Sequence, residues 1–166
     1  MKAYNIILFM ILHSFITVVS SQEIRDGFKI FTQDNVTWFE DVNKSKYMGP
    51  ILNNDGKNIA REPSYVFSSK EKVKKIEVEV YSEEERNYLL IHFKPTAILT
   101  VRANDGTIAS VSFIFKNLTD PSVIDIKKLQ TLQEKIKTEI LFDNLLFNGE
   151  KAVSGYMLGH IFFFRP

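Results

Sequence analysis

Histidine, cysteine and serine are the side chains that most often carry nucleophilic catalysis, and this chain offers few of them in a useful pattern. It contains no cysteine, and it has no G-x-S-x-G turn that would present an activated serine. Beyond the first 21 residues its histidines are His92 and His160, each within an apolar stretch that predicts a strand. A histidine in such a stretch is typical of a core or a sheet edge, so we interpret neither residue as a catalytic base.

Motifs for metals and cofactors are also missing. A zinc site needs three or four converging ligands, often closely spaced in the sequence, and neither histidine has such a neighbour. The stretch Asn53-Asn54-Asp55-Gly56 begins like a calcium loop, but the D-x-D-x-D-G spacing and the later glutamate are absent, so it predicts a plain turn. No glycine-rich phosphate loop occurs either. We therefore expect no cofactor and no resident metal.

Carboxylates leave two functional hypotheses open. The chain has 20 aspartates and glutamates, and the pair that would hydrolyse a glycoside is set by the fold rather than by sequence spacing. The first hypothesis is a non-catalytic binding or structural protein, and the alternative is a small secreted hydrolase or carbohydrate-active enzyme that uses a carboxylate pair. Trp38 and Phe39 are the candidate partner-binding residues, because adjacent aromatics form either a core plug or an exposed platform for a partner.

The first 21 residues have the three parts of a secretory signal peptide. A basic start at Lys2 precedes an apolar run over residues 4–19, and two serines follow it. The run is interrupted by polar residues and falls short of the ~20 mainly apolar residues that a spanning helix needs. We expect cleavage after Ser21, a mature protein that begins at Gln22, and no membrane span after cleavage.

The absence of cysteine also bears on the compartment. Small eukaryotic secreted domains depend on disulfides, so an exported chain without them favours the bacterial envelope, in the periplasm or outside the cell. Three sequons, at Asn35, Asn43 and Asn117, are interpreted as coincidence. The mature chain would carry 20 basic and 20 acidic groups, a balance that disfavours nucleic acid and anionic membranes. We expect its partner to be another envelope or extracellular protein.

The remaining 145 residues, 22–166, are predicted to form a single α+β domain. Its clearest unit is a hairpin, in which alternating apolar residues over 97–103 and 109–115 flank the turn Asn104-Asp105-Gly106. An amphipathic helix over 126–141 follows, and we expect Ser122 and Asp125 to form its capping box. Its apolar stripe contains Ile126, Leu129, Leu132, Ile136 and Ile140.

Several further strands would complete an antiparallel sheet of about five or six strands, with the 126–141 helix as the one main helix on one face. Residues 28–31 alternate as a half-buried strand does. The alternation over 76–81 and the apolar run over 88–93 predict two more strands that could pair as a hairpin. The nearly continuous apolar run over 160–164 predicts a closing strand inside the sheet, covered on both faces.

The order of these elements over 96–166 resembles the C-terminal domain of the energy-transducing TonB family. The resemblance is carried by Asp105-Gly106 and the apolar residues after it, the 126–140 helix, Phe142, Asn148-Gly149-Glu150 and the final aromatic strand. It implies a small periplasmic module of one sheet and one helix, used here as a free exported protein. It also implies an edge strand that pairs with a segment of a partner.

Overall fold

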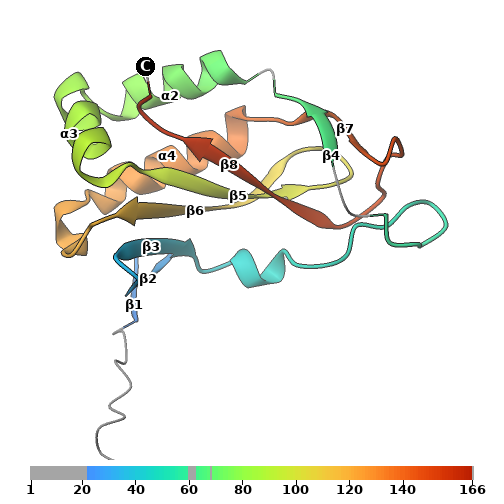
Figure 1. The fold of residues 1–166 in the computed structure, drawn as a ribbon, viewed down its shortest axis with the longest axis horizontal. Helices are drawn as coiled ribbons and strands as arrows, with labels where there is room; N and C mark the ends of the chain where they lie inside the picture. Colours follow the sequence, from blue (N-terminus) through green and yellow to red (C-terminus); the bar gives the residue numbers. More distant parts are fainter. Residues whose placement is uncertain (1–21, 60–62, 68, 166) are drawn as a thin grey trace, which may run out of the picture.

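A computed structural model describes residues 22–59, 63–67 and 69–165, so the predicted signal peptide lies outside the described residues. The described chain forms an α+β fold, as predicted, with three α-helices beside an antiparallel sheet of six strands and a second sheet of two strands (Figure 1). Within the described ranges, no helix is long and apolar enough to cross a membrane.

The large sheet has the strand order β1-β2-β3-β6-β5-β8, and every neighbouring pair is antiparallel. Its strands are β1 (Glu23–Arg25), β2 (Phe28–Gln33), β3 (Val36–Asp41), β5 (Thr96–Arg102), β6 (Ile108–Lys116) and β8 (Tyr156–Phe162). The small sheet pairs β4 (Pro63–Val66) with β7 (Asp143–Phe147). The helices are α2 (Lys70–Val80), α3 (Glu83–Phe93) and α4 (Ile126–Glu139), with short 3-10 turns η1 (Lys44–Lys46) and η2 (Pro121–Val123).

The central hairpin is confirmed as β5 and β6. Asp105 stabilises its turn, because one carboxylate oxygen accepts from the backbone N–H of Thr107 at 2.9 Å and from its hydroxyl at 2.6 Å. Gly106 has φ +75°, and a Cβ at this position would lie 2.0 Å from the carbonyl oxygen of Phe142. Only glycine fits this turn, which explains the Asp-Gly pair in the sequence.

Helix α4 is also confirmed, with one correction to its start. Leu129, Leu132 and Ile136 are buried on one stripe, and the helix lies along β6. The predicted capping box is wrong, because Asp125 alone caps α4 by accepting from the backbone N–H groups of Lys127 and Lys128. Ser122 belongs instead to η2.

The two strands predicted over 76–81 and 88–93 are wrong, since both stretches are helical, in α2 and α3. The three- and four-residue spacing that places Val73, Ile76 and Val80 on one face outweighs the local alternation, and Val78 is exposed. Ser82 begins α3 with a full capping box, in which its hydroxyl accepts from Glu85 N–H and the Glu85 carboxylate accepts from Ser82 N–H. The sheet therefore carries three helices rather than one main helix.

The closing strand is real but lies at the edge of the sheet, which corrects the prediction that it is internal. Strand β8 starts earlier than predicted and pairs with β5 alone among the described strands. Its side chains alternate between buried and exposed, and Leu158 and Phe162 face solvent. A nearly continuous apolar run therefore did not require two covered faces, because the outer positions of this edge strand stay apolar and exposed.

The core fills the space between the sheet and the helices and is rich in phenylalanine. Phe28, Phe39 and Phe113 are fully buried, and their rings meet edge to face with centroids 6.0 to 6.2 Å apart. A buried polar contact helps to dock α4, because Gln133 donates to the carbonyl of Val111 at 2.8 Å. The chain end returns to the helices, where Phe164 packs beside α2 (Figure 1).

Candidate functional site

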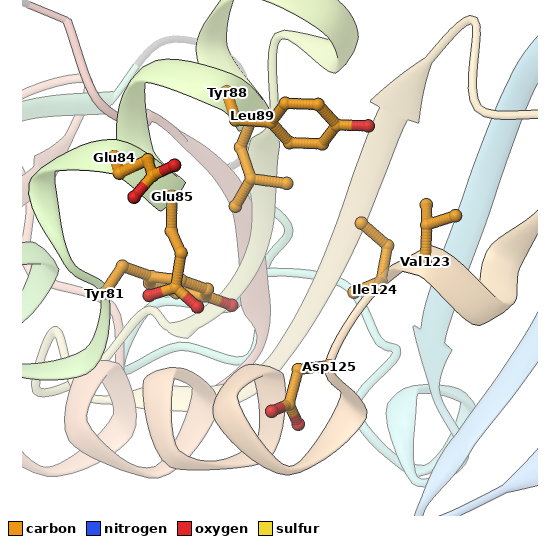
Figure 2. Close-up of a pocket in the computed structure, with 8 residues that line it drawn as sticks. All are labelled: Tyr81, Glu84, Glu85, Tyr88, Leu89, Val123, Ile124 and Asp125. Carbon is orange, nitrogen blue, oxygen red and sulfur yellow. The ribbon is translucent and has the colours of Figure 1, made fainter.

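A hollow of about 270 Å³ lies between the start of α3 and the segment that leads from η2 into α4 (Figure 2). Its lining combines aromatic, aliphatic and acidic side chains and contains no basic residue. The lining residues are Tyr81, Glu84, Glu85, Tyr88, Leu89, Val123, Ile124 and Asp125. We call this the α3–α4 pocket.

Two of the three carboxylates in the pocket are held there by helix capping. Glu85 is the third residue of α3 and closes the capping box with Ser82. Asp125 precedes α4, where its Oδ1 accepts at 2.9 Å from Lys127 N–H and at 3.2 Å from Lys128 N–H. Carboxylates at helix N-termini are stabilised by the helix dipole, so capping explains why each acid lies at the start of its own helix.

A single ammonium group compensates part of this charge. The Nζ of Lys128 contacts a carboxylate oxygen of Glu85 at 2.5 Å. This hydrogen bond, followed by the one from Ser82, holds the pKa of Glu85 below its ordinary value of 4.5. Glu84 has no hydrogen bond or ion pair within the described residues, and the second carboxylate oxygen of Asp125 has none there either.

Tyr81 is the most buried polar residue in the lining of the pocket. It is 5% exposed, its ring packs edge to face on Phe164 at 5.4 Å, and its carbonyl accepts from Arg86 at 2.9 Å. Figure 2 shows its hydroxyl directed toward the space between α3 and the start of α4. Burial, and then the charges of Asp125 and Glu85, raise the pKa of Tyr81 well above its ordinary value of 10.0.

The rest of the pocket is apolar. Leu89 and Ile124 are buried and belong to its floor, whereas Tyr88 and Val123 are about half exposed and form its rim. Figure 2 shows the ring of Tyr88 reaching from α3 toward Ile124 and Val123. An apolar floor with polar groups at one end is the usual composition of a ligand pocket.

The structure separates the two aromatics that the sequence marks as partner-binding candidates. Phe39 is fully buried and packs in the core against Phe115, at 5.4 Å between ring centroids. Trp38 points to the opposite face of the sheet, where it is half-buried and stacks on Phe31 at 5.9 Å. Because Phe39 has no exposed surface, only Trp38 can present a ring to a partner, and it does so outside the α3–α4 pocket.

Neither His92 nor His160 lines the pocket, although His92 contacts its rim residue Tyr88. His92 is exposed on helix α3 rather than on a strand, and its ring lies 4.6 Å from that of Tyr88. His160 is exposed on β8, a strand as predicted. Among the described residues, no group of three histidine, cysteine or carboxylate side chains is arranged to hold a metal ion.

The Asn-Asp-Gly stretch forms a turn, as predicted. Its Asn53 side chain accepts from the backbone N–H of Asp55 at 3.1 Å and of Lys57 at 3.0 Å, so the asparagine supports the loop itself. Two of the sequon asparagines have a similar backbone role, because Asn35 and Asn117 both adopt positive φ, at 61° and 60°.

The α3–α4 pocket was not predicted from the sequence. Tyr81 and Tyr88 lie in the stretches that predict strands, and Asp125 is separated from them by the whole β5–β6 hairpin. One local signal was available, since Ser82 followed three residues later by Glu85 is a capping box that marks a helix start. The convergence of two helix starts depends on the tertiary fold.

Comparisons with known proteins bear on the fold only. No family model matches the chain, and no curated protein matches it. Among solved structures, the fold is similar to the crystal structure of a DUF5043 family protein from Bacteroides uniformis ATCC 8492. The TM-score is 0.60 at 16% sequence identity, over 86% of this chain and 83% of that chain. These comparisons give no support to the TonB resemblance, and they point instead to a fold found in an uncharacterized domain family.

Proposed function

We propose that this chain is an exported, non-catalytic binding protein of the bacterial envelope, and that the α3–α4 pocket receives part of another envelope or extracellular protein. Export is supported by the basic start, the apolar run over residues 4–19 and the serines that follow it. The lack of cysteine supports a bacterial rather than a eukaryotic secreted protein.

The observation that carries the binding proposal is the state of the pocket carboxylates. A carboxylic acid that donates a proton in catalysis needs a raised pKa, as in glycoside hydrolases. The pKa of Glu85 is lowered instead, and both Glu85 and Asp125 already hold helix N–H groups. Carboxylates that accept helix N–H groups stay ionised, so they can bind a positively charged group but are poor proton donors.

The test is recovery of a partner by the protein and by two matched variants. Val123→Ser removes an exposed apolar side chain at the pocket rim, and Val78→Ser makes the same change on the exposed face of α2. We expect a protein recovered from the cell envelope fraction to be lost with Val123→Ser and retained with Val78→Ser. Equal recovery by both variants would contradict a role of the pocket in binding.

A carboxylate hydrolase is the second candidate function, and one observation favours it. Glu84, Glu85 and Asp125 line the same pocket, so the fold brings Asp125 to two adjacent acids from a distant part of the sequence. The measurement is turnover of glycan, ester and peptide substrates by the protein and by Glu84→Gln. Turnover that disappears in the folded variant would replace the binding proposal with the enzymatic one.

A further inference from the structure

We infer that the α3–α4 pocket recognises a primary ammonium group carried on an aliphatic stem, which is the chemistry of a lysine side chain. The inference rests on the proposed function, because it names the ligand class of the same pocket. Three features carry it: an excess of negative charge, a tyrosine hydroxyl that opens into the pocket with no hydrogen bond to the described residues, and an apolar floor beside the charged end.

The charge in the pocket favours a cation. Three carboxylates line the pocket, and the ammonium group of Lys128 binds one of them, Glu85. The N-terminus of α4 offsets part of the charge of Asp125, whereas Glu84 has no hydrogen bond or ion pair with the described residues. An incoming cation would find the carboxylate of Glu84 and the second oxygen of Asp125 available.

The hydroxyl of Tyr81 is the independent observation. Tyr81 is more than nine-tenths buried, yet its hydroxyl makes no hydrogen bond to the described part of the chain, and it is directed into the pocket (Figure 2). The hydroxyl oxygen is not itself sealed from solvent, so it is available to a ligand that enters the pocket. Its raised pKa keeps the hydroxyl neutral, so its oxygen can accept a hydrogen bond from an ammonium group.

The protein already places one ammonium group in this setting. The Nζ of Lys128 lies 5.7 Å from the centroid of the Tyr81 ring while it binds Glu85. Aromatic rings attract cations at this range, and carboxylates strengthen the attraction. The combination of tyrosine and carboxylate is therefore suited to hold a second ammonium group from outside.

The floor and the size of the pocket select the stem. Leu89 and Ile124 provide a buried aliphatic surface, and the exposed ring of Tyr88 covers one side. The volume of about 270 Å³ lies just below the usual range for ligand pockets, about 300 to 1,000 Å³. Such a pocket fits one extended side chain better than a cofactor.

The experiment measures binding by backbone amide NMR shifts of Tyr88, Leu89 and Ile124 in the purified protein. The probes are a Gly-Lys-Gly peptide, the same peptide with Nε-acetyl-lysine, butylamine and its neutral counterpart butan-1-ol. We expect the lysine peptide to bind and its acetylated form to bind about two- to fivefold more weakly, the upper range expected for one exposed ion pair. Added salt should weaken binding of the lysine peptide.

Matched variants locate the interaction. Glu84→Gln should weaken binding of the lysine peptide by about fivefold, whereas Glu83→Gln should leave it unchanged, because Glu83 is in the same helical turn but does not line the pocket. Tyr81→Phe should also weaken binding without loss of folding stability, since it removes a hydroxyl that has no partner in the described structure.

Each outcome decides between distinct conclusions. If the lysine peptide binds and butylamine binds only weakly, the ammonium group belongs to a lysine of a protein partner. If butylamine binds and the lysine peptide does not, the ligand is a free amine, and a protein partner at this pocket is contradicted. Equal binding of the acetylated peptide, or equal effects of Glu84→Gln and Glu83→Gln, would overturn the ammonium inference. A partner lost only with Val123→Ser would then still support the proposed function. No shift with any probe would overturn the inference.

Discussion

Replacement of Leu132 by alanine should destabilise the protein by about 2 to 5 kcal/mol. Leu132 is 2% exposed on the stripe of α4 that faces the sheet. The change removes three buried carbons, worth roughly 0.8 kcal/mol each, and the cavity left behind adds to this loss. Ile126→Ala should have about half the effect, because Ile126 is only partly buried where it packs against the core.

The assay is urea unfolding with a surface control on the same helix. Thr131 is exposed, and its hydroxyl donates only to the carbonyl of Lys127 one turn earlier, so Thr131→Ala should change the free energy of unfolding by less than about 0.5 kcal/mol. The midpoint of Leu132→Ala should fall while the slope with urea stays constant. A loss below about 0.5 kcal/mol for Leu132→Ala, or an equal loss for Thr131→Ala, would refute the docking of α4 on the sheet.

Three further predictions concern other parts of the chain. Burial raises the pKa of Glu77 above its ordinary value of 4.5, despite the backbone N–H that Phe164 donates to its carboxylate. The folded state therefore binds the Glu77 proton more tightly than the unfolded state does, and the stability of the protein falls as the pH rises above 4.5. Glu77→Gln should therefore gain stability relative to the natural protein between acidic and neutral pH in unfolding curves, and a constant difference would contradict this. Gly155→Ala should cost at least about 2 kcal/mol more than Gly56→Ala in the same assay; both glycines have positive φ, but only at Gly155 would the new Cβ meet backbone, at 2.4 Å. N-terminal sequencing of the exported protein should start at or near Gln22, and a form that retains the first 21 residues would contradict cleavage.

The elements that sequence analysis placed correctly are those whose signals are local. The β5–β6 hairpin is fixed by the Asp105-Gly106 turn and by alternation on both sides of it. Helix α4 is marked by an apolar stripe that continues over several turns, and that stripe is buried. In both cases residues close in the chain contain the whole pattern, so tertiary contacts reinforce it.

Helices α2 and α3 show why short apolar patterns mislead. Over six residues, Ile76, Val78 and Val80 alternate as a strand does, and the helical spacing becomes visible only when Val73 is included. In the protein Val78 is exposed, which a half-buried strand would not explain. The edge position of β8 was unpredictable for a different reason, because strand order depends on crossovers between distant segments.

The α3–α4 pocket illustrates how a site can be recognised when the sequence has no motif. Folding explains why Glu85 and Asp125 are acidic, since both cap helices. It does not explain why a buried position at the end of α2 is tyrosine rather than phenylalanine, because the hydroxyl of Tyr81 makes no hydrogen bond to the described residues. The Tyr81 hydroxyl and the Glu84 carboxylate line the same pocket without a hydrogen bond to the described residues, so both remain available to a ligand. The groups in this pocket that are available for function are therefore the polar side chains that folding does not use.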